Sequence, residues 1–512
     1  LTHLAGMLGR KVMLSSATIP PDLAAGLFEA YENGRRLYCN FMGLESPQTY
    51  CMWVDEFKSE IHRISCNDLA LNEFQSLHEQ FVQKRCRQLQ GNIVKQLGYL
   101  IHYDPTAQSD NKEQKLLSYF EEIKAQIYFL HNAHALIDEA SDKKVSFGLI
   151  RMANVKPCIQ LSRYLLNCDE PNFEIKALTY HSRELLIVRS AKEKYLDTVL
   201  RRKDSNPLHT LSNPLVRQQI ERCNKKNIIF VVVSTPVEEV GRDHDFDWAI
   251  IEPSSMRSII QLAGRVRRHR VQNTNTDKPN VGVLQFNLKA IFGKNPAFSH
   301  PGFESLREGF CLETKDMAQL VNWKEGQAPI NAIARISKAP QLQPAHQLAD
   351  LEHAVIAHKL LSDELTGALS LHGWLQEAWF LTGLPQQLNP FREKNADIPI
   401  FLRFNEEGKL QFHFKDDSKD FLPCEKKYNI VLDELTPLEK SHLWFHSDLK
   451  TELKHLLHSG WKDCETIEDV LNRSPELGEV LLIANEQTQF SNIYIDSLGL
   501  MCGVKIDHDE NH

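Results

Sequence analysis

Short apolar runs alternate with amphipathic segments between residues 144 and 290, and this rhythm limits the possible fold more than any other feature. Short apolar runs are typical of buried strands, and apolar residues at every third or fourth position are typical of helices. Their alternation predicts an α/β domain whose mostly parallel sheet is covered by helices on both faces. The predicted strands are Val145–Ile150, Glu174–Tyr180, Ile228–Val233, Trp248–Ile251 and Val281–Phe286, and the predicted helices are Ile159–Leu166, Glu184–Leu200 and Met256–Arg268.

Polar residues follow the third of these strands, where a parallel sheet places its ligands. Thr235 is predicted to contact a nucleic-acid phosphate through its hydroxyl and backbone N–H. Gly241 gives the backbone conformational freedom, and Asp243 can accept hydrogen bonds from ribose hydroxyls or hold neighbouring arginines. A turn-forming Thr-Pro pair and a structural aspartate are the alternatives.

The segment Gln261-Leu-Ala-Gly264-Arg265-Val-Arg267-Arg268 places several guanidinium groups after a small-residue break. Arg265 and Arg268 are three residues apart, so a helix would put them on one face, with Gln261 on the same face within one turn. The rigid, permanently charged arginine fork suits phosphate oxygens. We therefore predict that Arg265 and Arg268 contact phosphate, and that Arg268 is an arginine finger, the arginine that neutralises charge on a reacting phosphate. We predict that Gln261 contacts the nucleotide or a second domain, or lobe, that faces this one across the nucleotide. A basic surface helix is the alternative.

A third element, Ser16-Ala17-Thr18, closes the apolar run Lys11–Leu14, which predicts a short strand. The hydroxyls of Ser16 and Thr18 could form hydrogen bonds that link an acidic D-E-x-x motif of one ATPase lobe to a second lobe. A G-x-x-x-x-G-K-[ST] phosphate loop and a D-E-x-x box do not precede Ser16. We therefore expect the chain to be the C-terminal portion of a longer protein.

The rest of the chain divides by pattern. Residues 1–20 are predicted to end a first lobe, 21–143 to form a helical insertion, and 144–290 to form the second lobe. A linker at 291–345 leads to an accessory domain at 346–512. That domain contains a predicted hairpin of Ile400–Phe404 and Leu410–Phe414.

Composition narrows the classes of partner and compartment. Lys plus Arg is 59 against 67 Asp plus Glu, a net charge of −8, so any nucleic-acid groove must be local. The eleven cysteines are scattered singly, without a C-x-x-C pair, which predicts neither a metal site nor a disulfide framework and favours a reducing cytoplasm. No apolar run is long enough for a membrane span.

Together these motifs resemble the CRISPR-associated helicase-nucleases of type I interference systems, which are superfamily 2 motors. The helical insertion and the tail resemble the type I-F version, in which an adaptation-type domain is fused at the N-terminus. The resemblance rests on Ser15-Ser-Ala-Thr-Ile-Pro-Pro-Asp-Leu-Ala-Ala-Gly-Leu-Phe-Glu-Ala-Tyr31, Met152-Ala-Asn-Val-Lys-Pro157, Tyr180-His-Ser-Arg183, Thr235-Pro-Val-Glu-Glu-Val-Gly-Arg-Asp243 and Gln261-Leu-Ala-Gly-Arg-Val-Arg-Arg-His269.

The resemblance implies a RecA-like second lobe, ATP-driven 3′ to 5′ translocation on single-stranded DNA, and an upstream metal-dependent nuclease. ATP and Mg²⁺ would be bound mainly by the upstream lobe, and this chain by itself would be inactive. Further partners would be the crRNA-guided type I-F surveillance complex and the adaptation protein. An unrelated superfamily 2 motor and a non-catalytic binding module are the alternatives. The implied nucleotide-side residues are Gly241, Asp243, Gly264, Ser16 and Thr18, and the implied DNA contacts are Thr235, Ser182 and Arg183.

Overall fold

The structure is a computed structural model of the chain. It describes all residues except 46, 105–110, 203–206, 240, 271–276, 363–374, 376–381, 384–386, 388–396, 429, 484–490, 496–497 and 504–512. The parts of the expected accessory domain at 346–512 that fall on these residues lie outside the described residues.

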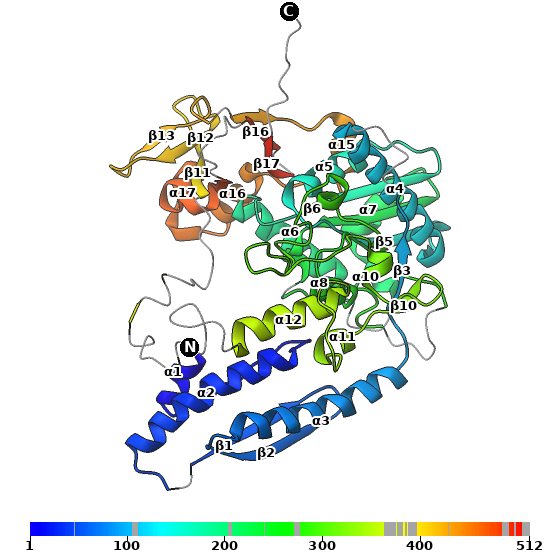
Figure 1. Cartoon of the computed structure of the whole chain (residues 1–512). Helices are drawn as coiled ribbons and strands as arrows, with labels where there is room; N and C mark the ends of the chain where they lie inside the picture. The colour runs from blue at the N-terminus through cyan, green and yellow to red at the C-terminus, as the bar shows by residue number, and fades with distance from the viewer. Residues whose placement is uncertain are drawn as a thin grey trace, which may run out of the picture.

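The centre of the molecule is an eight-stranded sheet (Figure 1). Its strands follow the order β10-β3-β9-β8-β5-β7-β6, and the short β4 pairs with β5. All neighbours from β3 to β6 are parallel, whereas β10 and β4 are antiparallel to their partners. The bounds are β3 Leu97–Ile101, β4 Leu136–Asp138, β5 Lys143–Arg151, β6 Phe173–Tyr180, β7 Asn227–Ser234, β8 Trp248–Ile251, β9 Val281–Leu284 and β10 Gln327–Pro329. The predicted α/β class with a mostly parallel sheet is confirmed.

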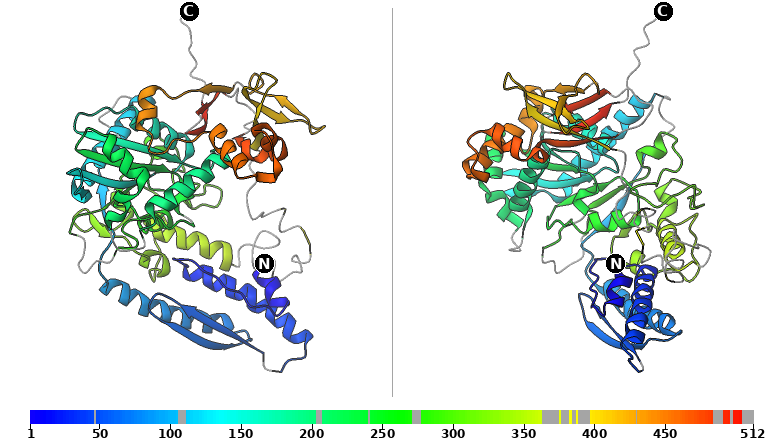
Figure 2. Two further views of the ribbon diagram at one scale, coloured as in Figure 1. Left: turned by 180° about the vertical axis from the view of Figure 1, so that it is seen from behind. Right: turned by 90° about the vertical axis from the view of Figure 1, so that its left-hand side faces the viewer.

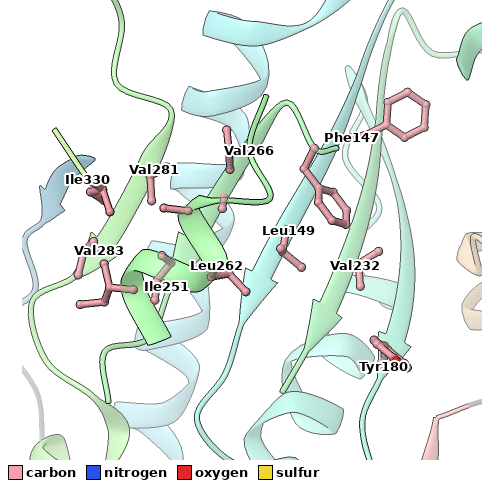
Figure 3. Close-up of a cluster of buried hydrophobic side chains, with 14 of the residues drawn as sticks. Phe147, Leu149, Tyr180, Val232, Ile251, Leu262, Val266, Val281, Val283 and Ile330 are labelled. Carbon is pink, nitrogen blue, oxygen red and sulfur yellow. The ribbon is translucent and has the colours of Figure 1, made fainter. Parts of the chain in front are cut away.

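Helices bury both faces of this sheet. Residues alternate along β5, so Phe147 and Leu149 pack under α6 (Leu186–Leu200), α7 (Pro214–Arg222) and α8 (Met256–Ala263). Ile150 points to the other face, toward α4 (Lys112–His134) and α5 (Val155–Leu166). Figure 3 shows the first of these layers, in which Leu262 and Val266 cover Leu149 and Ile251.

Two expectations for the N-terminal part are wrong. The stretch 21–143 is not purely helical, because β1 (Gln48–Val54) and β2 (Ser59–Ser65) form a hairpin and β3 pairs with β9 in the main sheet. The predicted strand Lys11–Leu14 is not formed, and Met13 is 88% exposed. In the described part of the chain this segment has no neighbouring strand to supply hydrogen bonds, so its apolar run stays irregular.

The N-terminal helices form a satellite layer below the sheet (Figure 2). Helix α1 (Thr2–Met7) packs against α2 (Pro21–Phe41), and α3 (Ala70–Gly91) covers the hairpin through an apolar cluster that includes Phe28 and Phe74. Helix α2 also lies against α12 (Leu348–Leu361), which in turn contacts α8. Figure 1 shows α12 between α8 and α2.

The segment predicted as a linker packs into the lobe. It follows α9 (Leu288–Ile291) and contains α10 (Met317–Leu320) and α11 (Ile333–Ile336), and its β10 extends the sheet beside β3. Met317 and Ile330 belong to the core.

The described part of the C-terminal region has two sheets, β13-β12-β11-β15 and β14-β16-β17. The first confirms the predicted hairpin, because β11 pairs with β12 in antiparallel register. The region contacts the lobe through Trp444, whose backbone N–H donates to the carbonyl of Ala177 on the edge strand β6 (3.0 Å). The indole is buried against Phe147 and Phe230. The helices and strands of the C-terminal region are β11 Asp397–Phe404, β12 Leu410–Lys415, β13 Phe421–Pro423, β14 Ile430–Asp433, α15 Pro437–His442, α16 Leu449–His458, α17 Ile467–Arg473, β15 Glu479–Ile483, β16 Ser491–Ile495 and β17 Gly499–Gly503.

Across the described residues, we find no helix with both the length and the apolar character that a membrane crossing requires.

The close approach of β5 and β8 gives a stability prediction. A Cβ atom at Gly148 would lie 2.1 Å from the ring of Trp248, which is fully buried and donates to the Ser146 hydroxyl (3.1 Å). We expect Gly148→Ala to lower the free energy of unfolding by about 1–3 kcal/mol, because the core must shift to admit the methyl group. Urea denaturation would measure the loss. Gly91→Ala, at the open end of α3, is the matched control and should not destabilise.

Candidate functional site

The arginine segment does not continue the helix, so the prediction of one helical face is wrong. Helix α8 ends at Ala263, with Gly264 as an exposed C-cap, and Arg267 has a φ of +50°. The following residues pair with the loop before β8: the Phe246 N–H donates to the Arg265 carbonyl (2.8 Å), and the Arg267 N–H donates to Phe246 (2.9 Å). These bonds replace the helical ones.

As a result the predicted arginines point in different directions. Arg265 is buried, and its guanidinium donates to the carbonyls of Glu238 (3.1 Å) and Glu239 (2.8 Å) in the turn after β7. Arg265 therefore fixes that turn, and a phosphate contact by Arg265 stays a prediction. Gln261 is half-buried one turn back in α8.

Arg268 faces solvent and pairs with a predicted partner. Its Nε lies 3.0 Å from Asp243 Oδ1, and the Arg268 side chain is 37% exposed. His269 Nε2 lies 2.8 Å from the same oxygen, and Arg201 Nε lies 4.0 Å from Oδ2. Asp243 thus holds the neighbouring arginines Arg268 and Arg201, which was one of its two predicted roles. An exposed ion pair contributes only about 0–1 kcal/mol, so a phosphate could displace Asp243 from Arg268 at small cost.

Two further aspartates, Asp245 and Asp247, form ion pairs with Arg270 at the end of the arginine segment. Asp245 and Asp247 follow Asp243 at alternate positions, and Arg270 Nη2 lies 3.0 Å and 2.6 Å from them. Asp247 also accepts from Arg202 (2.9 Å). Burial alone would raise the pKa of Asp247, but Arg202 and Arg270 outweigh it and lower that pKa. This cluster was not predicted, although the D-x-D-x-D alternation of Asp243, Asp245 and Asp247 near an arginine run was the available signal in the sequence.

Arg151 is a second missed residue. It ends β5, is fully buried, and its Nε donates to Glu239 Oε1 (3.0 Å). Its remaining nitrogens donate to the Glu252 carbonyl (2.7 Å) and to the hydroxyls of Ser254 (2.7 Å) and Ser258 (3.1 Å). One side chain therefore joins the ends of β5 and β8, the turn after β7 and helix α8. A lone arginine directly after an apolar run was the only hint in the sequence.

The predicted DNA contacts lie at the ends of adjacent strands. Thr235 follows β7 and is buried, and its N–H donates to the Tyr180 carbonyl at the end of β6 (3.1 Å). Ser182 is exposed and Arg183 is half-buried in the loop after β6. Neither caps α6, whose N-cap is Leu185.

A buried histidine orders the loop that carries Ser182 and Arg183. The Arg183 N–H donates to His181 Nδ1 (3.1 Å), and His181 Nε2 lies 2.7 Å from the Leu498 carbonyl. Burial lowers the pKa of His181 to about 3, so the ring is neutral. A neutral ring that accepts at Nδ1 donates its Nε2–H to Leu498. The C-terminal region therefore supports this loop.

The remaining predicted residues do not form one cluster. Gly241 has a φ of +72° and is exposed in the loop that leads to Asp243. Ser16 is exposed, and its hydroxyl accepts from the Thr18 N–H (3.4 Å). Thr18 is buried just before α2, the helix that contacts α12.

The site contains buried acidic and histidine side chains, but in the described residues no group of three or more His, Cys, Asp or Glu side chains could hold a metal ion. His244 Nδ1 lies 2.6 Å from Glu238 Oε1, and its Nε2 lies 3.1 Å from Asp197 Oδ1.

Comparison with known proteins covers the lobe and most of the chain. The family described as CRISPR-associated nuclease/helicase Cas3, C-terminal, matches residues 144–271. CRISPR-associated nuclease/helicase Cas3 subtype I-F/YPEST of Pseudomonas aeruginosa is 36% identical over 418 residues, 81% of this chain. The Pectobacterium atrosepticum protein of the same description is 36% identical over 409 residues, 78% of this chain. A solved structure of T. fusca Cas3-AMPPNP matches 98% of this chain and 49% of that chain at 13% identity, with a TM-score of 0.41.

The chain spans 38% of the Pseudomonas protein and 36% of the Pectobacterium protein. The match covers both the arginine segment and the strand-end loops that carry the predicted contacts. The chain is therefore related, over most of its length, to the CRISPR-associated nuclease/helicases of subtype I-F, as its motifs predict.

Proposed function

We propose that this chain is the second helicase lobe and C-terminal region of an ATP-dependent 3′ to 5′ single-stranded DNA translocase that feeds a nuclease in type I-F CRISPR interference. The observation that carries the proposal is the relationship to the subtype I-F proteins over 81% of the chain. The exposed Arg268, with only the weak Asp243 ion pair to leave, supports it.

The proposed reaction takes place between this lobe and a first lobe. Water attacks the γ-phosphorus of ATP, the bond to the β–γ bridging oxygen breaks, and ADP and phosphate leave. Arg268 would leave Asp243 and neutralise the charge that develops on the phosphate oxygens. Arg265 would hold the turn after β7, and Gln261 would face the nucleotide or the first lobe. Mg²⁺ would be held mainly by the first lobe and would neutralise the β- and γ-phosphates.

The DNA would cross the carboxyl ends of β6 and β7. Thr235, Ser182 and Arg183 lie on the loops after these strands, where hydroxyls and a guanidinium can bind backbone phosphates. Since the chain carries a net charge of −8, this groove would be local and sequence-independent.

Further proposals follow from the relationship. The crRNA-guided type I-F surveillance complex and the CRISPR adaptation protein would be partners, and a divalent metal would serve the nuclease domain, which this chain would not contain. We place the protein in the cytoplasm, and its described cysteines, all free thiols, suit a reducing compartment. We keep residues 144–290 as the proposed centre of the second lobe, to which β3 and the segment 291–345 each add a strand.

The first test asks whether this chain hydrolyses ATP without the first lobe. This chain by itself should show no DNA-stimulated ATP hydrolysis, whereas the complete protein that the proposal requires should hydrolyse ATP. The reason is that a phosphate loop and its metal supply most contacts to the triphosphate. Steady-state phosphate release with and without single-stranded DNA measures both. Hydrolysis by the isolated chain would show that it holds a phosphate site of its own and would contradict the split-lobe proposal.

A second test addresses the arginine finger. In the complete protein, Arg268→Ala should lower DNA-stimulated kcat by about 10³-fold or more, the range known for arginine fingers. Arg268→Lys should recover only part of it, because a point charge lacks the planar fork. Arg201→Ala is the matched control, since Arg201 also lies near Asp243 but outside the motif. Full activity of Arg268→Ala would remove the finger assignment.

A third test addresses DNA. Arg183→Ala in the complete protein should weaken single-stranded DNA binding and reduce the slope of log K against log salt by about 0.7, the value for one phosphate contact on a single strand. Fluorescence anisotropy at several salt concentrations gives the slope. The exposed Arg222, at the end of α7, provides the control variant Arg222→Ala. An unchanged slope for Arg183→Ala would exclude it from the DNA path.

A further inference from the structure

The carboxylate of Glu352 in α12 is fully buried and binds two partners in different elements. Its Oε1 accepts the N–H groups of Met256 (2.5 Å) and Arg257 (3.3 Å), the first two residues of α8. Its Oε2 lies 2.5 Å from Arg335 Nη1 of α11. Burial raises the pKa of Glu352, and Arg335 and the two amides oppose that shift.

These contacts fix the beginning of the helix that carries the arginine segment. The Ser255 side chain caps α8 by accepting the Ser258 N–H (3.1 Å), and Glu352 supplies acceptors for the two N–H groups before it. A carboxylate at this position also interacts favourably with the helix dipole. At the other end, Arg265 is tied to the turn after β7. Helix α8 is therefore held at both ends, by Glu352 where it begins and by Arg265 just after it ends.

A later part of α12 contacts the helix that follows Ser16-Ala17-Thr18. A Cβ atom on Gly26 of α2 would lie 2.9 Å from Leu360 Cβ, so the two helices pack closely. Asp22, at the start of α2, lies 2.6 Å from Lys338, which follows α11. Helices α11 and α12 thus form one support between α2 and α8 (Figure 1).

We infer that Glu352 is a positioning residue that fixes α8 to this support, so that the arginine segment keeps its place relative to the Ser16–Thr18 end of the chain. The inference rests on the proposed function, because only a reaction between two lobes needs this spacing. Glu352 does not touch nucleotide or DNA in this scheme. It acts through the backbone of α8 on Arg268, and an error of about 1 Å in such a group can cost about 100-fold in rate.

The test compares two double variants of the complete protein. Glu352→Leu with Arg335→Leu removes the buried charges together and the acceptors for α8, while it keeps the packing volume; such replacements commonly preserve stability. Glu352→Gln with Arg335→Gln removes the charges but keeps an amide oxygen for the Met256 N–H. We expect kcat for DNA-stimulated ATP hydrolysis to fall at least about 10-fold in the leucine variant, with KM for ATP within about twofold. The glutamine variant should stay within about threefold of wild type.

The control is Glu439→Leu with Arg163→Leu, a pair that joins α15 to α5 and has a buried carboxylate of its own. It should leave kcat within about twofold. Melting temperatures, and hydrogen exchange at the amides of Met256 and Arg257, show whether α8 alone has loosened. Exchange there should be faster in the leucine variant than in the glutamine variant.

The possible failures are distinguishable. A wild-type protein without DNA-stimulated hydrolysis would overturn the proposed function and with it the role of Glu352. An active wild type with an unchanged kcat in a folded leucine variant would overturn the positioning role alone. Equal losses in the leucine and glutamine variants would show that the charges act, and not the bonds to α8, and would also overturn it.

Discussion

The buried guanidinium of Arg151 is the interaction on which the site depends. An unpaired charge at this depth would cost several kcal/mol, so every nitrogen needs a partner, and the partners come from separate elements: Glu239, Glu252, Ser254 and Ser258. The same requirement fixes the turn after β7 and the start of α8 relative to the sheet. Arg265 then binds carbonyls of that turn, so the arginine segment inherits its position from Arg151.

The exposed part of the site is built differently. Buried ion pairs of Asp245 and Asp247 hold Arg270, whereas Asp243 holds Arg268 at the surface, where water weakens the attraction. Within one short segment, the ion pairs of Arg270 are therefore strong and fix its side chain, whereas the ion pair of Arg268 is weak and can be released. Such a gradient suits a group that must be positioned before a phosphate arrives and must then change partners.

The sequence was sufficient for the strands of the lobe, because five apolar runs coincide with β5 to β9 and period and length leave few other interpretations. It was insufficient for the arginine segment, where hydrogen bonds to Phe246 override the helical spacing of Arg265 and Arg268. β3 was missed for a similar reason, since its partner β9 is about 180 residues away. The Glu352, Arg335 and Met256 contacts join distant parts of the chain, and no local pattern encodes them.

Trp444 has a consequence for how the protein is made. The sheet's edge at β6 and the hollow between Phe147, Phe230 and Tyr195 are covered by residues that lie over 200 positions later in the chain. During synthesis the lobe emerges long before its cover, so an open strand edge and these apolar rings face solvent for the interval. Contacts of such long sequence separation form late, and the nascent chain is then most exposed to aggregation. We therefore expect the docking of the C-terminal region onto β6, through Trp444, to be the last step in the folding of the lobe.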